Sequence, residues 1–371
     1  MKYYIIAGEA SGDLHGANLM KALYQQDKEA TIHYWGGDLM QQVGGTLVKH
    51  YRDLAFMGFI EVVFNLRTIL KNITLCKKDI AAFQPDVLIF IDYPGFNMRI
   101  AKWAKIKGIK THYYISPQIW AWKEGRIKDI KRDVDAMYVI LPFEKPFYED
   151  KHQFPVHFVG HPLIDEIANR EQADAITFRK ENGLDQRPII AILPGSRKQE
   201  ISKMLEVMLS IVGDFKDYQF VIAGAPSQDE SFYQTFIKTP NVHLLLNKTY
   251  DLLSLSYAAL VTSGTATLET ALFKVPQVVC YKGNQISYEI AKRIIKLKYI
   301  SLVNLILDNE VVTELIQSDF NKKRLKEELS KILIESNRAA LFIAYYDLEK
   351  KLGGIGASKK TAQLIVEAAK K

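Results

Sequence analysis

The chain has 371 residues, 48% of them hydrophobic and 25% charged, with a formal net charge of +7 at pH 7. This length is too great for one compact core, so we expect two domains. No stretch of 18 apolar residues is present, which argues against a transmembrane helix. Cys76 and Cys280 have no disulfide-type or metal-type spacing and favour a reducing cytoplasm. The positive charge favours anionic partners: nucleotides, phosphorylated substrates, nucleic acid or an acidic membrane surface.

Short apolar runs alternate with amphipathic segments of helical length. In the first half the runs are KYYIIAG (2–8), TIHYWGG (31–37), DVLIFID (86–92), THYYIS (111–116) and MYVIL (137–141). In the second half they are IIAILPGS (189–196), QFVIAGA (219–225), HLLLN (243–247), AALVTSGT (258–265) and PQVVCY (276–281). Continuous apolar runs of this length are typical of buried parallel strands. We therefore predict an α/β protein with two doubly wound domains, divided within the polar stretch between Gly160 and Pro188.

The first apolar run leads into GEASGDLHGA (8–17). Ligands of doubly wound sheets bind outside the carboxyl ends of the strands, which is where this stretch lies. Its glycines, Gly12 among them, recur every fourth residue and match neither the dinucleotide fingerprint nor a P-loop. Asp13 is placed to cap the helix that begins near Leu14, and capping alone would explain it. Glu9, Ser11 and His15 have no such structural task, so they favour recognition of a hydroxyl-rich ligand.

Asp92 directly follows the apolar run at 86–91 and precedes a Tyr-Pro-Gly turn. We expect its carboxylate to emerge, partly desolvated, at the ligand edge of the sheet, where a raised pKa would suit a general base. The alternative is a carboxylate hydrogen-bonded to the amides of its own turn. Farther along, SPQIWAWKEGRIKDIKR (116–132) places two tryptophans beside a basic helix, which fits either core packing or ligand stacking.

The second domain offers two candidate phosphate sites, and the first is LPGSRKQE (193–200). Gly195, Ser196 and Arg197 lie where a strand leads into an amphipathic helix. The N-terminus of a helix attracts anions, and the guanidinium of Arg197 adds a fork suited to a phosphate.

The second candidate is VTSGTATLE (261–269), which repeats the arrangement with Ser263, Gly264 and Thr265 at the start of a helix. A diphosphate bound there would leave Glu269 placed to accept two hydrogen bonds from a ribose diol. Two such loops in one domain, facing a domain that bears carboxylates, favour a nucleotide-activated substrate held in a cleft.

The motifs resemble, in order and along nearly the whole chain, those of the lipid-A-disaccharide synthase family. They are GEASGD (8–13), IDYPGFN (91–97), SPQIWAW (116–122), LPFEKPFY (141–148), GHPLID (160–165), LPGSR (193–197), SGTATLE (263–269) and YISLVNLI (299–306). The resemblance implies a GT-B fold with two Rossmann-like domains and a cleft between them. It also implies inverting transfer, without metal or cofactor, of 2,3-diacylglucosamine from its UDP donor to the 6-hydroxyl of 2,3-diacylglucosamine 1-phosphate.

The resemblance also assigns domains and a location. It implies an N-terminal acceptor domain at 1–165, a UDP-sugar domain at 166–345 and C-terminal helices at 346–371 that return to the first domain. The two acylated sugars would be the partners, with a membrane surface and no nucleic acid. The expected location is the cytoplasmic face of the inner membrane of a Gram-negative-type bacterium.

Carried over by position, the family pattern makes Asp92 the catalytic base and places Glu9 and Asp13 in the reaction region. Substrate contacts are expected from Ser11, Gly12, Ser196, Arg197, Ser263, Gly264, Thr265, Glu269 and Asn304. Val303 stands where some members have a proline, which leaves the aim of Asn304 open.

The segment GFIEVVFNLRTILKNITLCKK (58–78) is the expected membrane-docking helix. One helical stripe is apolar and is expected to face the core: Phe59, Val62, Val63, Leu66, Ile69, Leu70 and Ile73. A second ladder mixes apolar and cationic side chains, as interfacial helices do: Ile60, Phe64, Arg67, Lys71, Leu75 and Lys78. A surface helix with scattered apolar residues is the alternative.

Two rival functions remain. One is another UDP-sugar enzyme of the same architecture, such as a 2-epimerase. The other is a non-enzymatic binder of anionic lipid or nucleic acid, with KWAKIKGIK (102–110) and AKRIIKLK (291–298) as its footprint. Neither rival gives Asp92 a task.

Overall fold

The computed structural model describes residues 1–54, 66–284, 288 and 297–370. The chain divides into two compact units, Met1–Asp165 with Leu352–Lys371 and Glu166–Lys351. Each unit is a parallel sheet with helices packed on it, which confirms the predicted α/β class. Residues 346–351, which we expected in the returning segment, are the last turns of a helix in the second unit.

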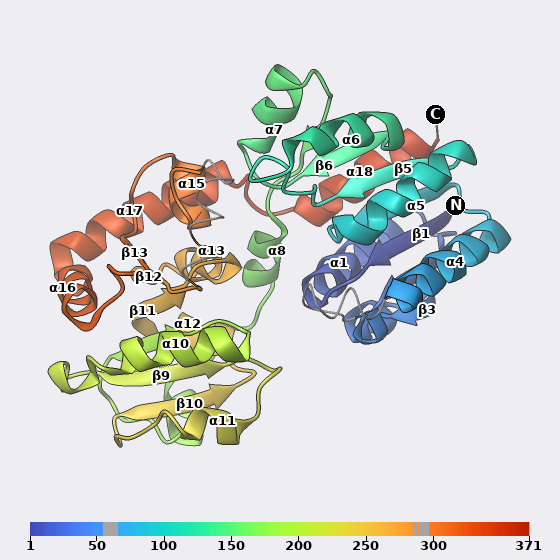
Figure 1. Ribbon diagram of the computed structural model, residues 1–371. Coiled ribbons are helices and arrows are strands. Elements are labelled where there is room, and N and C mark those ends of the chain that lie inside the picture. Colours follow the sequence, from blue (N-terminus) through green and yellow to red (C-terminus); the bar gives the residue numbers. More distant parts are fainter. Residues whose placement is uncertain (55–65, 285–287, 289–296, 371) are drawn as a thin grey trace. The chain divides into compact units, whose positions relative to one another are not determined.

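The first unit has a seven-stranded parallel sheet with the order β3-β2-β1-β4-β5-β6-β7 (Figure 1). Its strands are β1 (Lys2–Ala7), β2 (Thr31–Gly36), β3 (Thr46–His50), β4 (Val87–Ile91), β5 (Lys110–Tyr114), β6 (Ala136–Val139) and β7 (His157–Phe158). Its helices are α1 (Ala10–Gln26), α2 (Asp38–Val43), α4 (Leu66–Phe83), α5 (Pro94–Ile106), α6 (Ile127–Asp133), α7 (Glu144–Pro146) and α18 (Ala357–Ala369). Three short turns are η1 (Tyr51–Leu54), η2 (Glu124–Arg126) and η3 (Phe147–Lys151). Helix α8 (Pro162–Ala168) spans the boundary of the units.

The central strands are buried on both faces. Tyr4 and Leu88 lie in a core shared with α4, α5 and α6, while their neighbours Tyr3 and Ile89 are fully buried on the opposite face. Successive side chains of a strand alternate between faces, so a strand covered on both sides reads as an unbroken apolar run. This is why the sequence predicted these strands well.

The C-terminal segment is fixed to the first unit, where α18 packs against α1. Asp165 accepts hydrogen bonds from the amides of Gly356 and Ser358 at the start of α18. The amide of His161 donates to the carbonyl of Leu352 at 2.9 Å. Asp165 lies within the GHPLID motif, so that motif anchors the returning helix.

The second unit has a six-stranded parallel sheet with the order β10-β9-β8-β11-β12-β13. Its strands are β8 (Ile189–Leu193), β9 (Gln219–Gly224), β10 (Val242–Leu246), β11 (Ser256–Thr262), β12 (Gln277–Tyr281) and β13 (Glu314–Ile316). Its helices are α9 (Ala175–Glu181), α10 (Lys198–Leu209), α11 (Glu230–Gln234), α12 (Thr249–Ser254), α13 (Thr265–Leu272), α15 (Leu302–Leu307), α16 (Lys322–Ile332) and α17 (Glu335–Lys351), with a short turn η4 (Val212–Asp214).

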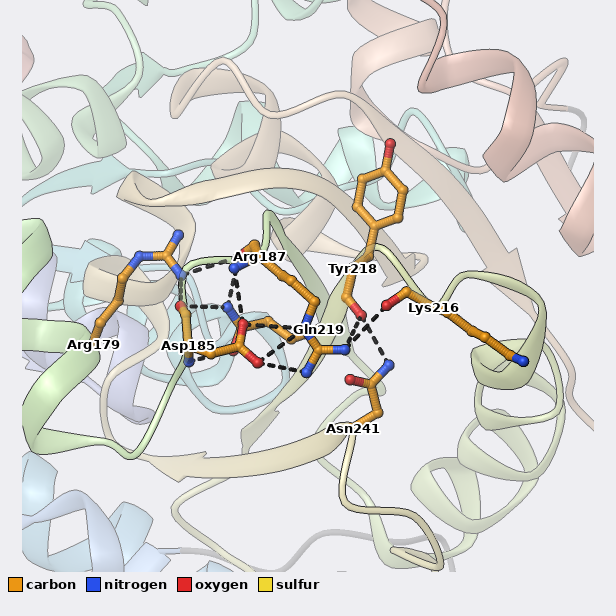
Figure 2. A network of polar contacts seen from close by, with 7 residues as sticks. All are labelled: Arg179, Asp185, Arg187, Lys216, Tyr218, Gln219 and Asn241. Atoms are coloured by element: carbon orange, nitrogen blue, oxygen red, sulfur yellow. Dashed lines mark hydrogen bonds and ion pairs between the residues drawn. The ribbon is translucent and has the colours of Figure 1, made fainter.

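A polar network closes the amino-terminal edge of this second sheet (Figure 2). The buried side chain of Gln219, the first residue of β9, donates to the carbonyls of Asp185 and Arg187 and accepts from the amide of Asp185. Arg187 pairs with the Asp185 carboxylate and donates to the carbonyl of Lys216. The network fixes the chain where it enters β8 and β9, at the end opposite to the expected ligand edge.

Each apolar run expected to be a strand forms one, but β3, β7 and β13 were not predicted. All three are edge strands: β3 and β7 end the first sheet, and β13 is one of the two edge strands of the second. Strand β7 has two residues and β13 has three, while β3 is only partly buried. Edge strands of this kind lack the continuous apolar run of a central strand.

The two cysteines are free thiols, each fully buried. Within the part of the chain that the structure describes, no helix is long and apolar enough to cross a bilayer.

Candidate active site

The predicted residues of the first unit follow the carboxyl ends of three neighbouring strands, at what we call the ligand edge of the sheet. Strand β4 pairs with both β1 and β5, and Ala7 lies opposite Ile91 at their carboxyl ends. Glu9 follows β1, Asp92 follows β4, and the loop 115–126 follows β5. Since parallel strands end at the same edge, the topology brings these three segments together.

Asp92 sits in a strained turn that two side chains fix. Its backbone lies in the left-handed region at φ 43°, a conformation that is uncommon for a residue other than glycine. The Asn97 amide and the Tyr113 hydroxyl each donate to the Asp92 carbonyl at 2.7 Å. These bonds stabilise the turn and leave the carboxylate at the sheet edge.

The pKa of Asp92 is raised to about 6: burial is the main cause, the negative charge of Glu9 adds to it, and the hydrogen bond from the backbone amide of Tyr93 partly opposes both. Such a carboxyl is largely ionised at neutral pH yet basic enough to accept a proton. Both effects considered from the sequence, desolvation and a hydrogen bond from the turn, therefore act on the pKa of Asp92. Desolvation is the larger of the two, so the pKa is raised.

Glu9 is the N-cap residue of α1, and its side chain is exposed and makes no capping hydrogen bond. Beside it, a Cβ at Gly8 would overlap the ring of Tyr93. Gly8 is thus required for the close approach of the β1 and β4 loops, and this contact keeps Glu9 near Asp92.

Glu9→Gln is expected to move the acid limb of the kcat/KM profile to lower pH. The wild-type limb is expected near pH 6, where Asp92 loses its proton, and removing the neighbouring negative charge lowers the pKa of Asp92. A pH series with saturating donor and limiting acceptor measures the shift. Glu29→Gln, an exposed carboxylate on the amino-terminal side of β2, is the control and should leave the limb in place.

Asp13, which we predicted in the reaction region, has a structural role in the fold. Its buried carboxylate accepts hydrogen bonds from the amides of Gly37, Leu39 and Met40, at 2.7, 3.0 and 3.1 Å. These are the free amides at the start of α2, so Asp13 caps the neighbouring helix α2 rather than its own. These contacts give Asp13 a structural role, and the acid–base role expected from the sequence stays a prediction.

The other residues of this turn divide between exposed and buried positions. Ser11 is exposed beside Glu9. Gly12 is buried, and a Cβ there would lie 3.1 Å from the Cβ of Ala7, so this glycine lets α1 pack closely on β1. His15 is buried, burial lowers its pKa to about 4, and its Nδ1 has no hydrogen-bond partner among the described residues. Ser11 is available to a ligand, whereas Gly12 acts through packing.

The loop 115–126 is held in place by a buried carboxylate. Glu144 accepts hydrogen bonds from the amides of Ile140 and Leu141 and from the hydroxyl of Ser116 in the loop. Burial raises the pKa of Glu144 to about 7. The two tryptophans of the loop differ: Trp120 packs edge-on against Phe143, with ring centres 4.7 Å apart, whereas Trp122 is 47% exposed.

The Arg197 loop of the second unit has the expected form. Arg197 is the exposed N-cap residue of α10, and among the described residues it has no ion-pair partner. Gly195 has φ +103°, and a Cβ there would lie 2.5 Å from the Glu200 carboxylate. Ser196 is exposed, and its carbonyl accepts from the Ser227 hydroxyl at 3.1 Å. The Glu200 carboxylate lies beside this loop and repels anions, so it partly cancels the attraction that Arg197 gives the start of α10.

The start of α13 carries no carboxylate in its first turn. Gly264 has φ +141°, which requires glycine, and Thr265 beside it is exposed. The Ser263 hydroxyl donates to the carbonyl of Ile300 at 3.0 Å. Burial raises the pKa of Glu269, whose Oε1 accepts from the Tyr250 hydroxyl at 2.8 Å. Of the two phosphate sites predicted in this unit, the start of α13 is therefore more favourable for an anion than the start of α10.

Asn304 is fully buried and uses its whole side chain within the protein. Its amide nitrogen donates to the carbonyl of Val312 and to Glu314, and its oxygen accepts from the amides of Val311 and Val312. No donor or acceptor of Asn304 remains for a ligand in this structure. Asn304 therefore links α15 to the chain that leads into β13, and the substrate contact expected from the sequence stays a prediction.

Sequence reasoning missed Tyr113, Asn97, Glu144 and Tyr250. The first three lie in or beside the motifs IDYPGFN, SPQIWAW and LPFEKPFY, and these motifs were the only signal for them in the sequence. Their roles depend on contacts between segments that follow different strands, which the sequence does not show. Tyr250 had no signal in the sequence.

No group of three His, Cys, Asp or Glu side chains that could hold a metal ion occurs in residues 1–54, 66–284, 288 and 297–370.

Comparison with known proteins identifies the family. A family model described as lipid-A-disaccharide synthetase matches residues 3–367. The chain belongs to this family. A lipid-A-disaccharide synthase from Syntrophus aciditrophicus is 39% identical over 99% of this chain and 97% of its own length. Another from Geobacter metallireducens is 38% identical over 98% and 96%. These findings confirm the resemblance read from the motifs.

Solved structures with the same fold include sugar-nucleotide enzymes of two kinds. A UDP-GlcNAc 2-epimerase from Neisseria meningitidis has a TM-score of 0.65 and 14% identity, with 99% of both chains covered. The glycosyltransferase of kitacinnamycin has a TM-score of 0.67 and 12% identity, covering 99% of this chain and 98% of its own. At such low sequence identities, these similarities establish the fold alone. Both transferases and epimerases have this fold, so it does not decide between the two activities.

Proposed function

We propose that this chain is an inverting glycosyltransferase that moves 2,3-diacylglucosamine from UDP to the 6-hydroxyl of 2,3-diacylglucosamine 1-phosphate. The products are the β-1,6-linked disaccharide 1-phosphate and UDP. Family membership supports the reaction. The observation that carries it in the structure is the partly buried carboxyl of Asp92 at the ligand edge, with a pKa of about 6.

In the proposed step, Asp92 accepts the proton of the acceptor 6-hydroxyl as that oxygen attacks the anomeric carbon of the donor sugar. The new bond joins oxygen to the anomeric carbon, and the bond from that carbon to the UDP oxygen breaks. One displacement from the face opposite the leaving group inverts the anomeric centre. A carboxyl with a pKa near the working pH serves this proton transfer well.

The leaving UDP gains negative charge, which the second unit is equipped to stabilise. Arg197 supplies a cation at the start of α10, and the free amides at the start of α13 supply a positive helix end. Glu269, one turn inside α13, is proposed to accept from the ribose hydroxyls with its second oxygen, since Tyr250 occupies the first. Ser196, Ser263, Gly264 and Thr265 complete the proposed donor site.

The decisive assay measures UDP release with and without the acylated acceptor, together with the sugar products. The transferase predicts UDP release that depends on the acceptor and matches disaccharide formation mole for mole. A 2-epimerase would instead change the configuration of the donor sugar with no acceptor present, and that result would replace the proposal.

Arg197→Ala is expected to weaken binding of UDP and of the donor by about 10- to 100-fold, the range for losing a charged hydrogen bond, and to leave acceptor affinity unchanged. Equilibrium titration with UDP and the acceptor KM measure the two sides. Lys203→Ala removes another exposed cation of α10 and should change neither value. An equal loss for donor and acceptor would contradict the placement of Arg197.

We also propose that helix α4 docks on the membrane that holds the acylated substrates. Its exposed side chains include Arg67, Lys71 and Lys78 together with Leu75, which is 43% exposed. Leu70 was expected on the buried stripe but is 53% exposed, so it joins this face, whereas Ile73 is buried. Ile60 and Phe64, predicted for the same ladder, lie outside the described residues, as do Phe59, Val62 and Val63.

Sedimentation with anionic vesicles tests the docking face. Leu70→Ser/Leu75→Ser should bind less at any salt concentration, because apolar burial is lost. Arg67→Ser/Lys71→Ser/Lys78→Ser should lose the part of binding that fades with salt, about 1 kcal/mol for each cation. Ile334→Ser/Ile343→Ser, which removes two exposed isoleucines of the second unit, is the matched control. Undiminished binding by both α4 variants would exclude this face.

A further inference from the structure

The loop that follows β5 carries a cationic cluster that the proposed chemistry has not used. We define the cluster as Trp122, Lys123 and Arg126. The Lys123 Nζ lies 4.2 Å from the centre of the Trp122 ring, and the Arg126 guanidinium carbon lies 5.8 Å from it. Trp122 is 47% exposed and Lys123 is exposed, so the cluster is open to a ligand.

Within the described part of the chain, no carboxylate neutralises the positive charge of the cluster. The acid beside it, Glu124, is paired with Lys151 at 2.6 Å and with His152 at 2.9 Å. Among the described residues neither Lys123 nor Arg126 has a carboxylate within ion-pair distance. Two cations therefore remain available to an external anion.

The loop is preformed rather than loosely tethered. Besides the Glu144 contact with Ser116, Ile119 is 2% exposed, and the Tyr148 hydroxyl donates to the carbonyl of Pro117 at 3.2 Å. Lys123 holds a left-handed backbone at φ 56°, which the surrounding structure must maintain. A site held this way binds with a smaller loss of conformational entropy.

From these observations, and resting on the proposed function, we propose that Lys123 and Arg126 bind the 1-phosphate of the acceptor, with Trp122 packed against its sugar. Guanidinium and ammonium groups are the usual protein partners of phosphate, and an indole offers an apolar face beside a polar edge. The first unit otherwise presents the carboxylates Asp92 and Glu9 at this edge, which repel a phosphate.

The topology fits the two functional groups of the acceptor. Its 1-phosphate on C1 and its reacting 6-hydroxyl, carried on C5 through C6, flank the same ring oxygen and so lie on one side of the sugar ring. Asp92 follows β4 and the cluster follows β5, which pairs directly with β4, so the two features lie on neighbouring loops of one edge. The cluster would thus set acceptor specificity and orient the hydroxyl toward the base.

Equilibrium binding in neutral detergent micelles tests this without requiring transfer. The probes are 2,3-diacylglucosamine 1-phosphate and its phosphate-free methyl glycoside, added to the full chain and followed by tryptophan fluorescence. Wild type should prefer the phosphate about 10- to 100-fold. Arg126→Gln and Lys123→Gln should each reduce this preference, and the double variant should abolish it. Lys128→Gln, which changes an exposed lysine in the first turn of α6, should behave as wild type.

Three results would overturn the inference: no preference for the phosphate in wild type, an unchanged preference in the double variant, or a loss of UDP affinity equal to the loss of phosphate preference. Binding to phosphatidylglycerol vesicles forms a separate arm, and a defect confined to vesicles would assign the cluster to the bilayer instead. Because these readouts need no turnover, failure of the transferase assay leaves them interpretable. Unchanged urea midpoints would show that the variants are folded.

Discussion

Asp92→Asn is expected to lower turnover by roughly 10² to 10⁴, the range for loss of a general base, with fold and UDP affinity retained. The substitution keeps the shape of the side chain, and the hydrogen bonds that fix the turn go to the Asp92 carbonyl, which asparagine also has. Steady-state kinetics with both substrates saturating measures the loss.

Asp53→Asn is the matched control, because it neutralises a carboxylate that is 56% exposed on the same unit. Since burial holds the pKa of Asp92 above its ordinary value, the ionised carboxylate disfavours folding, and its contribution to stability falls as pH rises through about 4 to 6. Asp92→Asn should therefore be at least as stable as wild type at pH 8. Turnover like that of wild type would reassign the base to Glu9, because the Asp13 carboxylate is committed to α2.

Glu144→Ala is expected to destabilise the first unit by about 2–6 kcal/mol, because two buried amides each lose an acceptor at about 1–3 kcal/mol. Those amides belong to Ile140 and Leu141, and the Ser116 hydroxyl loses its partner as well. All four tryptophans of the chain, Trp35, Trp103, Trp120 and Trp122, lie in the first unit. Urea unfolding followed by tryptophan fluorescence therefore reports the unit in question.

Glu144→Gln separates charge from hydrogen bonding. Its oxygen can accept from both amides, so it should retain most of the stability. The folded-state pKa of Glu144, about 7, is above its ordinary value, so the folded chain holds the proton and stability declines as pH rises from about 4.5 to 7. The glutamine variant should lack this decline. A glutamine variant as unstable as the alanine one would show that the site requires the carboxylate itself.

The sequence determined the central strands and the chemistry of the edge. Tyr3, Tyr4, Leu88 and Ile89 belong to strands buried on both faces, and burial of that kind leaves a continuous apolar run that can be read without a structure. Asp92 could be identified because a carboxylate directly after such a run must emerge at the carboxyl end of a parallel strand. Strands β3, β7 and β13 had no equivalent signal, because β7 and β13 are only two and three residues long and β3 is only partly buried.

Tertiary structure decided which polar residues are free. Asp13 and Asn304 occur in motifs and have side chains suited to a ligand, but their partners are the amides of Gly37 and Val312, which only the folded chain brings near. Leu70 shows the same limit for helices, because periodicity defines a stripe, whereas the neighbouring elements decide how much of that stripe is covered. Sequence therefore determined the residue types and the strand ends, whereas the contacts between distant segments, which satisfy buried donors and acceptors, were decided by the fold.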